Sequence, residues 1–392
     1  MRFNLWEDCN RVPLTELLSF IVDNRGKTVP TAPSGHKLIA TNCVTNNTLF
    51  PVYDKIRYLS EETYQTWFRA HPIPGDILFV NKGTPGRVCL VPDPVDFCIA
   101  QDMIALRADE SKIYPKYLFT VLRSREIQQQ IYNTNVGDVI PHFKKQFLDQ
   151  LLIPIPERSI QESIGDLYYV LSLKAERNKK INDNLADLLQ TIYQERFVND
   201  ILAVNQGVLS DICSYSRDKV AVSELNIRTY FSTENMLSGK AGSTEATSLP
   251  TTSQTIACHK GDTLISNIRP YFKKIVYCED KCGCSTDVLC FTPSQPRYSA
   301  YLFSTLYADK FFAFMVAGSK GTKMPRGDKQ QIMTYPVVLP SEEELAGFNT
   351  IASPLLEQIY SNRAENKRLS ILRDTLLPKL MSGEIDVSAV QL

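Results

Sequence analysis

The sequence has no excess of charge of either sign and no long hydrophobic run. Its 392 residues include 43 lysines and arginines and 43 aspartates and glutamates, so the formal net charge is zero. This balance excludes a uniformly basic surface, and any basic patch has to be local. No apolar run approaches the ~18 residues that a membrane-spanning helix needs, and residues 1–14 contain no apolar signal segment. We expect a cytoplasmic protein without membrane contact, whose ten cysteines are mostly reduced thiols.

The motifs of common catalytic sites are also missing. The sequence contains no glycine-rich phosphate loop of the G-x-x-x-x-G-K-[ST] type, no G-x-G-x-x-G and no H-E-x-x-H. It lacks the Asp-Pro-Pro-aromatic and Asn-Pro-Pro-aromatic runs that amino-methyltransferases use. The four histidines are scattered, and isolated histidines are more often surface or core residues than catalysts. These absences predict a chain that is not an enzyme and that binds no metal or cofactor of its own.

Four cysteines, Cys278, Cys282, Cys284 and Cys290, lie close together in the sequence. Zinc sites usually use tight cysteine pairs that are well separated from each other, and only Cys278 and Cys282 have a tolerable spacing. The even spacing of the last three, in a predicted strand over residues 284–291, favours cysteines that act as small buried hydrophobic residues. A metal site at this cluster remains the less favoured alternative.

The most informative feature that is present is a stretch that occurs twice. A shift of 184 residues, without a gap, superimposes residues 156–197 on residues 340–381. Under this shift Asn178 matches Asn362 and Asn182 matches Asn366. Three leucine pairs also match: Leu171 with Leu355, Leu185 with Leu369 and Leu188 with Leu372. A fixed period of this kind divides the chain into two halves, each a globular block followed by a long helix.

Both copies of the repeat are predicted to be helices that pair with each other. Apolar residues recur every three or four positions as a heptad seam, and about 40 helical residues span about 60 Å. In the first copy the seam consists of Ile164, Leu167, Leu171, Ile181, Leu185, Leu188 and Ile192. The seam turns polar in the middle of each copy, which weakens a helix pair but defines its register. The polar residues are Lys174, Asn178, Gln358 and Asn362. Packing of each helix on its own block is the less favoured alternative.

The stretches before the helices predict two globular blocks of similar fold. Short apolar segments broken by proline and glycine indicate strands joined by loops, followed by an amphipathic helix over residues 117–132. In the second block Gly261-Asp262 corresponds to Gly75-Asp76, and Asp287 corresponds to Asp102. We predict a first block over residues 1–152 and a long helix within 153–205. A second block over 206–336 and a second long helix with a tail over 337–392 then follow. Identity between the blocks is sparse, so we expect one fold with two different working surfaces.

Cations gather on glycine-containing loops in both blocks. Residues 317–329 hold four cations and one carboxylate, and basic residues surround Tyr271 and Phe272. Such loops suit contacts with nucleic-acid phosphates, and arginine can also read base edges. A single lysine or arginine on a loop is usually just solvated, but the same placement in both halves favours a role in nucleic-acid contact. The predicted DNA-contacting residues are Arg25, Lys27, Lys82, Arg87, Lys144, Lys145, Arg269, Lys273, Lys274, Lys320, Lys323 and Arg326.

The C-terminal run over residues 376–386, LLPKLMSGEID, closely resembles the ending of specificity subunits of type I restriction–modification systems. Residues 23–30 and 230–235 resemble segments common in that family's target recognition domains, and the alternation of block and long helix matches its layout. The first copy departs from the pattern, because it has IYQERF at residues 192–197 where the second has the Leu-Pro-Lys-Leu ending. This departure predicts two unequal docking sites for partner subunits.

The resemblance implies an α+β fold with an internal pseudo-twofold repeat. Two similar mixed α/β target recognition domains would be separated by two long antiparallel helices that form a coiled-coil spacer. The resemblance also implies a non-catalytic, sequence-specific DNA-binding subunit of a type I restriction–modification complex. It would read a bipartite site on double-stranded DNA and scaffold two methyltransferase subunits and the motor–nuclease restriction subunits.

In that reading the partner methyltransferase, and not this chain, uses S-adenosylmethionine to methylate adenine N6. The predicted partner-binding and spacer residues are Leu171, Leu185, Leu188, Leu355, Leu369, Leu372 and Leu376. The alternative function is a protein–protein scaffold, or a silent or decoy specificity subunit, that does not read DNA. A fused nuclease or methyltransferase is disfavoured, because no sequence remains for a catalytic domain once the two repeats are assigned.

Overall fold

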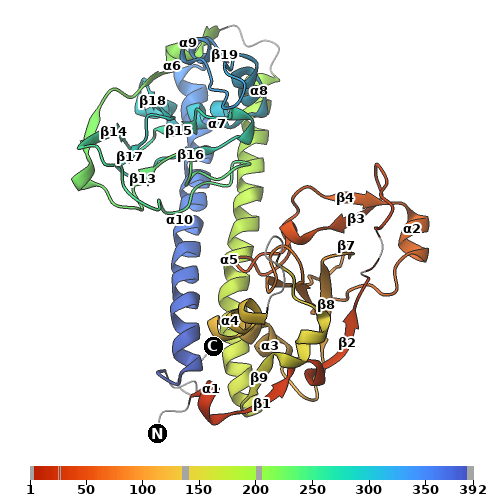
Figure 1. The fold of residues 1–392 in the computed structure, drawn as a ribbon. Helices are drawn as coiled ribbons and strands as arrows, with labels where there is room; N and C mark the ends of the chain where they lie inside the picture. The colour runs from red at the N-terminus through yellow and green to blue at the C-terminus, as the bar shows by residue number, and fades with distance from the viewer. Residues whose placement is uncertain (1–3, 25, 27, 135–140, 200–204, 386–392) are drawn as a thin grey trace. The chain divides into compact units, whose positions relative to one another are not determined.

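The computed structural model describes residues 4–24, 26, 28–134, 141–199 and 205–385. The chain forms two compact units. Unit 1 contains residues 1–178 and 364–392, and unit 2 contains residues 179–363. The two long helices, α5 (Arg158–Tyr193) and α10 (Glu342–Met381), each contribute one segment to each unit. Each unit therefore consists of one globular block and a stretch of paired helix (Figure 1).

Two sheets form the block of unit 1. The larger sheet is antiparallel, with the strand order β2-β8-β5-β6. Its strands are β2 (Leu18–Val22), β5 (Ile77–Val80), β6 (Val88–Leu90) and β8 (Met103–Ala108). The smaller sheet has the order β4-β3-β7 and consists of β3 (His36–Ile39), β4 (Arg57–Leu59) and β7 (Phe97–Ile99), with β3 parallel to β7. A separate pair joins β1 (Asn10–Pro13) to β9 (Leu152–Ile155), the strand that leads into α5.

Four shorter helices complete unit 1: α1 (Leu5–Asp8), α2 (Glu61–Thr66), α3 (Pro115–Leu122) and α4 (Arg125–Thr134). The prediction of a single helix over residues 117–132 is wrong, because α3 ends at Leu122 and α4 begins at Arg125. The Ser124 hydroxyl accepts the backbone N–H of Ile127 at 3.3 Å, and the Gln128 side chain donates to the carbonyl of Leu122 at 2.7 Å. A side-chain oxygen at this position starts a new helix, because it satisfies an N–H that the first turn leaves without a partner.

Unit 2 repeats this architecture. Its larger sheet has the order β11-β18-β15-β16, with β11 (Cys213–Tyr215), β15 (Thr263–Ser266), β16 (Ile275–Tyr277) and β18 (Val288–Pro293). The second sheet has the order β12-β14-β17-β13, with β12 (Lys219–Ala221), β13 (Tyr230–Phe231), β14 (Gln254–Cys258) and β17 (Cys282–Cys284). Strand β10 (Gln206–Val208) pairs with β19 (Pro336–Val338), which leads into α10. The short helices are α6 (Leu209–Ile212), α7 (Ser299–Tyr307), α8 (Asp309–Ala317) and α9 (Lys329–Met333).

The internal repeat predicted from the sequence is present in both blocks. Helices α3 and α7 begin 184 residues apart, in agreement with the shift between the long helices. The first strands of the two blocks, β1 and β10, begin 196 residues apart. The gap-free correspondence therefore covers the C-terminal part of each half. The extra residues of the first half lie before that part, within the loops of its sheets.

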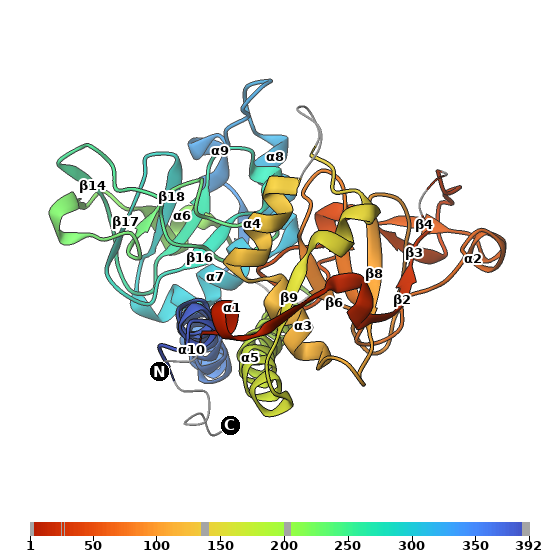
Figure 2. The ribbon, with the colours of Figure 1, turned by 60° about the horizontal axis from the view of Figure 1, so that its bottom comes forward.

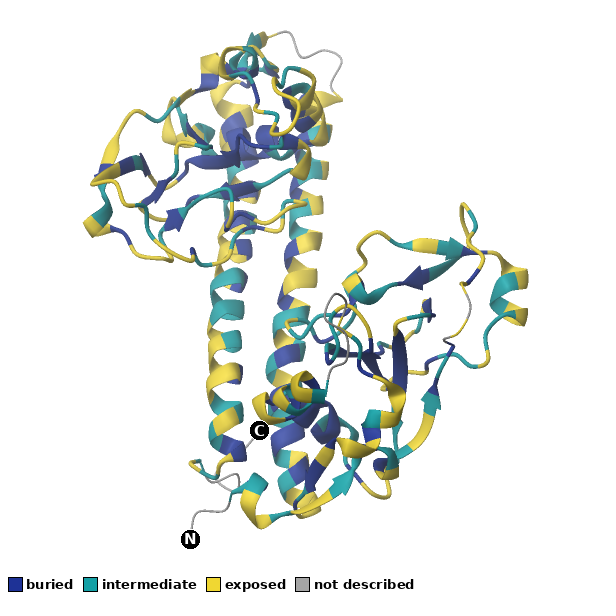
Figure 3. Ribbon diagram, in the orientation of Figure 1, coloured by how far each residue is buried: buried dark blue, intermediate teal, exposed yellow. Residues whose placement is uncertain are grey.

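The core of each unit lies where its larger sheet and its α3 or α7 helix meet the long helices. In unit 1 the fully buried Tyr117 and Phe119 of α3 belong to one apolar cluster with Ile164 and Tyr168 of α5. In unit 2 Tyr301 of α7 joins Leu189 and Tyr193 of α5 and Phe348 of α10 in the corresponding cluster. Figure 2 shows α3 and β9 beside α5, and Figure 3 shows buried residues along the strands of each unit and on one side of the long helices. Burial of these aromatic side chains, each 150–250 Å² of apolar surface, holds the block to the helix.

The two long helices pair in an antiparallel manner within each unit, and asparagines join them. In unit 1 the Asn178 amide donates to the Asn366 side-chain oxygen at 3.0 Å, and in unit 2 the Asn362 amide donates to the Asn182 oxygen at 2.8 Å. The repeat maps one asparagine pair onto the other. Asn178, Asn182 and Asn362 are buried. This arrangement confirms the predicted pairing of the helices and, at Asn178 and Asn362, the predicted polar centre of the seam. Lys174 and Gln358, which were also predicted for that centre, are exposed.

The apolar seam differs from the prediction at three positions. Ile181 is 45% exposed, Leu188 48% and Leu372 45%, so these residues do not lie between the helices. The buried face instead follows Tyr168, Ser172, Asn178, Asn182 and Leu189. Of the other predicted spacer leucines, five are half-buried: Leu171, Leu185, Leu355, Leu369 and Leu376. The predicted seam is therefore wrong at these three positions. At the centre Asn182, next to Ile181, takes the buried place, because asparagines that bond to each other can replace apolar residues there.

The ends of α10 show how local sequence sets its limits. The Ser341 hydroxyl accepts the N–H of Glu344 at 3.2 Å, and the Glu344 carboxylate accepts the N–H of Ser341 at 2.7 Å, which is a capping box. The helix continues through Pro378 and ends before Gly383, whose φ is +68°. Among the described residues, every helix is either too short or too polar to cross a membrane.

Candidate nucleic-acid interface

The same turn occurs once in each unit and carries several of the predicted cations. In unit 1 it joins β5 to β6 over residues 81–87, and in unit 2 it joins β15 to β16 over residues 267–274. The backbone N–H of Asn81 donates to the carbonyl of Asp102 at 2.7 Å, and the N–H of Asn267 donates to the carbonyl of Asp287 at 2.8 Å. The buried asparagine therefore ties the turn to the residue that precedes the central strand β8 or β18.

A second loop closes each turn from the other side. The N–H of Gly83 donates to the carbonyl of Pro141 at 3.0 Å, and the N–H of Arg269 donates to that of Pro325 at 2.8 Å. The following residues complete the match, because Lys82 forms a β-bridge with His142 and Ile268 forms one with Arg326. We call the unit 1 group, residues 81–87, 101–102 and 141–145, the first turn site. The unit 2 group, residues 267–274, 285–287 and 320–327, is the second turn site.

The first turn site surrounds a polar hollow of about 530 Å³. Its lining residues include Asp23, Asn81, Lys82, Gln101, Asp102 and His142. The Lys82 ammonium lies 4.0 Å from the Asp102 carboxylate, and the Lys145 ammonium lies 3.3 Å from the Asp23 carboxylate. Gln101 and Asp102 both have positive φ, at +38° and +57°. Backbone strain of this kind gathers at functional sites.

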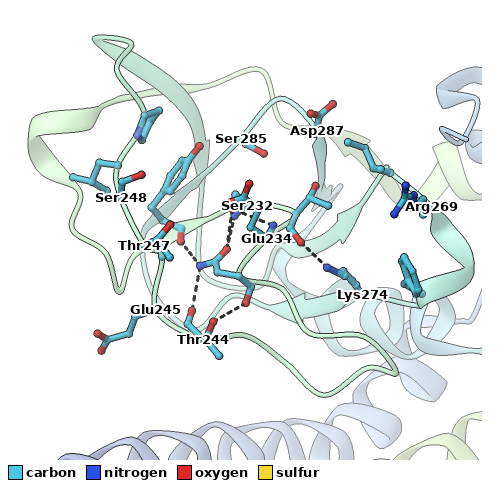
Figure 4. A pocket seen from close by; sticks show the side chains of 18 of the residues that line it. Ser232, Glu234, Thr244, Glu245, Thr247, Ser248, Arg269, Lys274, Ser285 and Asp287 are labelled. Atoms are coloured by element: carbon cyan, nitrogen blue, oxygen red, sulfur yellow. Dashed lines mark hydrogen bonds between the residues drawn. The ribbon is translucent and has the colours of Figure 1, made fainter. Parts of the chain in front are cut away.

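The second turn site borders a larger cleft of about 690 Å³. Figure 4 shows its labelled side chains: Asp287 and Glu234 lie on the side of Arg269 and Lys274, hydroxyl groups lie between, and Glu245 lies on the opposite side. The buried Asn235 amide organises the floor, donating to the carbonyls of Tyr230 at 2.9 Å and Thr244 at 3.1 Å. The Lys274 ammonium donates to the carbonyl of Thr233 at 2.6 Å, and burial lowers the pKa of Lys274. The cleft thus offers both hydrogen-bond donors and hydrogen-bond acceptors, as a surface that reads base edges requires.

Carboxylates hold many of the predicted DNA-contacting cations. Arg326 pairs with Asp287 at 3.1 Å, Lys273 pairs with Asp309 at 3.0 Å, and Lys320 pairs with Asp328. Hydrogen bonds from Lys240 and Lys273 lower the pKa of Asp309, and a bond from Lys320 does the same for Asp328. Within the part of the chain that the structure describes, Arg87, Lys144 and Lys323 form no ion pair. Arg25 and Lys27 lie outside the described residues.

The structure therefore brings most of the predicted cations to two equivalent places. Lys82, Arg87, Lys144 and Lys145 gather at the first turn site. Arg269, Lys273, Lys274, Lys320, Lys323 and Arg326 gather at the second. Contact of these residues with DNA stays a prediction. The carboxylates Asp309 and Asp328 pair with these cations, and spacing does not predict the pair of Lys273 with Asp309, which lies 36 residues later. Asp102 and Asp287 carried a signal, since they already correspond in the repeat.

Five of the six cysteines of unit 2 form one buried cluster. Cys258, Cys278, Cys282, Cys284 and Cys290 are each at most 4% exposed, and the sulfurs of Cys278 and Cys282 lie 3.6 Å apart. They come from separate strands, since β17 ends at Cys284 and β18 contains Cys290, so the single strand predicted over residues 284–291 is wrong. Their burial confirms the prediction of small hydrophobic residues. Among the described residues, no group of three or more potential ligands is arranged to hold a metal ion.

Comparison with known proteins gives consistent matches. Residues 19–195 match the family model described as "Type I restriction modification DNA specificity domain". The type I restriction enzyme MjaIX specificity subunit of Methanocaldococcus jannaschii is 20% identical over 373 residues, which cover 80% of this chain and 78% of that protein. The HindI specificity subunit of Haemophilus influenzae is 25% identical over 153 residues, which cover 38% of this chain and 33% of that protein.

A solved structure shows the same fold over nearly the whole chain. The crystal structure of the type I restriction–modification system S subunit from M. genitalium has a TM-score of 0.59 with this chain. The sequences are 18% identical, and the match covers 97% of this chain and 98% of the other. The duplicated architecture of two mixed α/β blocks and two long helices is thus that of a known fold.

Proposed function

The chain belongs to the family of type I restriction–modification specificity subunits, and from this premise we propose that each of its two units reads one half of a bipartite DNA site. The single observation that carries the proposal is the duplicated turn site. Both units hold the same three-part backbone frame, while the side chains on that frame differ. Shared scaffolding with different side chains is what two recognition surfaces of one protein need when each reads different bases.

The turn sites suit DNA because they combine cations with polar acceptors. Exposed lysines such as Lys144 and Lys323 can neutralise phosphates, and the cleft of the second turn site contains groups that can meet base edges. Several cations are held by carboxylates, so phosphate contacts at these positions require exchange of one partner for another. The zero net charge of the chain also indicates that its own electrostatic attraction to DNA is weak. We therefore propose that tight binding to DNA requires the assembled complex.

We further propose that the paired long helices act as a spacer and as a docking surface for partner subunits. Leu188 and Leu372 correspond in the repeat, and both are exposed, one in each unit. Equivalent exposed leucines in the two halves suit two copies of one partner. In this proposal two methyltransferase subunits dock on the helices and use S-adenosylmethionine to methylate adenine N6, and the motor–nuclease subunits join the complex. The chain itself positions the complex in the cytoplasm on its site and catalyses nothing.

The second candidate is a scaffold, or a silent or decoy subunit, that assembles with partners but does not read DNA. The pairing of loop cations with carboxylates is the observation that favours it, since paired cations offer less charge to phosphates. Two observations favour DNA reading instead. Lys144 and Lys323 form no ion pair among the described residues, and the backbone of Arg269 is left-handed.

The proposed function is tested by co-expression of this chain with a type I methyltransferase subunit, followed by genome-wide sequencing of N6-methyladenine in the host. We expect methylation confined to one split motif, with two short half-sites around a gap of constant length. A control culture expresses the methyltransferase without this chain and should lack the motif. A complex that co-purifies but leaves no methylation pattern would contradict the proposal and support the silent subunit.

A further inference from the structure

The backbone of the two turn sites is left-handed at the same two positions, but the residues there differ. In unit 1 these positions are Gly83, with φ of +84°, and Gly86, with φ of +87°. In unit 2 they are Arg269, with φ of +50°, and Lys273, with φ of +51°. The correspondence rests on hydrogen bonds, because Gly83 and Arg269 both donate to the proline of the second loop. Glycine adopts this conformation freely, whereas other residues pay about 1–2 kcal/mol.

Lys273 has an evident role in the fold at its strained position. Its ammonium lies 3.0 Å from the carboxylate of Asp309, which also binds Lys240 at 2.7 Å. The three residues therefore hold the turn against the first residue of α8. A side chain that anchors the turn compensates for the strain of its own backbone.

Arg269 has no such compensation. Among the described residues, its side chain donates one hydrogen bond, from Nη2 to the carbonyl of Lys323 at 3.5 Å, which is at the limit of a hydrogen bond. Its Nε is buried and has no hydrogen-bond partner. A buried N–H without a partner costs about 1–3 kcal/mol, so Arg269 adds a second unfavourable feature to its strained backbone. The strained backbone and the weakly bonded end of the guanidinium indicate a ligand that is not part of this chain. Because Nε is buried, such a ligand would meet Nη1 and Nη2.

The surroundings of Arg269 show what kind of ligand fits. Figure 4 places Arg269 at the rim of the cleft, near Asp287 and across from the hydroxyl-bearing wall of Ser232 and Ser285. Carboxylates of Glu234, Glu245 and Asp287 also line the cleft. Glu245 and Asp287 already pair with Arg228 and Arg326. The carboxylate of Glu234 repels a phosphate and can accept the amino group of a base. The backbone of Arg269 is held by Pro270, which follows it, and by its N–H bond to Pro325, so the side chain starts from a defined position, whereas phosphate-contacting lysines are usually mobile and exposed.

We propose that Arg269 is a specificity-determining residue that reads a guanine in the half-site of unit 2, through a bidentate bond to O6 and N7. This inference rests on the proposed function. Arginine paired with the O6 and N7 acceptors of guanine in the major groove is the commonest specific protein–base contact. The base would supply acceptors to the side chain, and would thereby offset the strain that unit 2 carries where unit 1 has Gly83. Unit 1 has no arginine at this position and must read its half-site differently.

The test compares Arg269→Gly with Lys273→Gly in the co-expressed complex. Both variants place the glycine of unit 1 in the same left-handed position, so both should fold. Arg269→Gly should unfold at the wild-type temperature or above it, whereas Lys273→Gly also loses the pair with Asp309, so its gain and loss should nearly cancel. For Arg269→Gly we expect discrimination at one guanine of one half-site to fall about 10- to 100-fold, while the other half-site stays unchanged. Lys273→Gly should lower methylation of all sites to a similar degree and keep the base preference at every position.

Arg269→Lys sharpens the test, because lysine keeps the charge but loses the bidentate geometry. We expect it to relax the same guanine position. An even loss of methylation across all sequences in Arg269→Gly, with full recovery in Arg269→Lys, would show a phosphate contact and overturn the inference. A wild-type motif without a guanine–cytosine pair in the relaxed half-site would also overturn it. A wild-type complex that leaves no split motif would instead overturn the proposed function, and this inference with it.

Discussion

The turns before strands β5 and β15 have the same backbone, yet they solve one electrostatic problem in two ways. In unit 1 the buried Asp76 carboxylate accepts two hydrogen bonds from the Arg107 guanidinium, at 2.9 and 3.0 Å. In unit 2 the corresponding Asp262 is 1% exposed but has no arginine. It accepts the N–H of His259 at 2.8 Å and the thiol of Cys290 at 3.2 Å. The comparison teaches that this turn requires a carboxylate, while the partner of the carboxylate is free to change.

The two turn sites likewise share a backbone frame and differ in the side chains that the frame carries. The asparagine, the aspartate carbonyl and the proline carbonyl recur in both units, because backbone hydrogen bonds define the frame. The side chains that point away from the frame differ in nearly every position. The conserved geometry therefore serves the fold, and the differences are where each unit has its own function.

Removal of the Arg107 guanidinium should have the largest effect, because it leaves the Asp76 carboxylate buried without its partner. We expect Arg107→Ala to lower the free energy of unfolding of unit 1 by about 3 kcal/mol. Both tryptophans, Trp6 and Trp67, belong to unit 1, so tryptophan fluorescence during urea unfolding reports this unit. Arg158→Ala is the matched control, because its pair with Glu162 is exposed and should be worth less than about 0.5 kcal/mol. Equal effects of the two substitutions would contradict the role of Arg107.

The asparagine pairs of the long helices should have a smaller and equal effect in the two units. Asn182→Leu removes the acceptor of the Asn362 amide and should cost unit 2 about 2 kcal/mol. The double variant Asn182→Leu with Asn362→Leu should recover most of that loss, because two leucines leave no unsatisfied donor. Amide hydrogen exchange in the helix pair measures both effects. Asn366→Leu, which removes the acceptor of the Asn178 amide, should reproduce the single effect in unit 1, and a difference between the units would show that the two pairs are not equivalent.

Lysines with and without a carboxylate partner should differ in their contribution to DNA binding by the complex. Lys323→Ala should weaken binding by about fivefold at 0.15 M salt, evenly across sequences, and flatten the salt dependence by about 0.9 units of slope. Lys320→Ala should do less, because Lys320 already pairs with Asp328. Fluorescence anisotropy of a labelled duplex at several salt concentrations measures both variants. An unchanged slope in Lys323→Ala would refute a phosphate contact at this residue.

The ion pairs of Asp309 should have the smallest effect, visible only in acid. Hydrogen bonds from Lys240 and Lys273 lower the pKa of Asp309 below its ordinary value of 3.8. A depressed carboxylate pKa stabilises the fold above the pKa of the unfolded chain, and this stabilisation is lost as the pH falls through the folded pKa. Because Asp309 is 68% exposed, we expect Asp309→Asn to cost less than about 0.5 kcal/mol at pH 6. The difference from the wild type should shrink as the pH falls below 3.8, as measured by thermal unfolding from pH 6 into acid.

Much of the fold followed from local sequence. Residue spacing predicted the long helices and their central asparagines, because a helix places every third or fourth residue on one face. The repeat and the C-terminal run could be recognised directly in the sequence. Sequence also located the loops where the cations gather, since glycine and proline mark turns. It did not separate α3 from α4, because the break depends on Ser124 and Gln128 capping a helix end.

The sequence by itself thus determined the duplicated architecture and the family, because hydrophobic period and motif are local properties. Only the tertiary structure decided which cations are paired. Arg326 forms an ion pair with Asp287, which lies 39 residues earlier in the chain, and sequence spacing does not predict that contact. Tertiary packing likewise placed Asn182 in the helix seam and left Leu188 exposed. It also forced Arg269 into the left-handed conformation where unit 1 has a glycine. Burial, ion pairing and backbone strain arise when distant segments meet, and these three properties distinguish the two units.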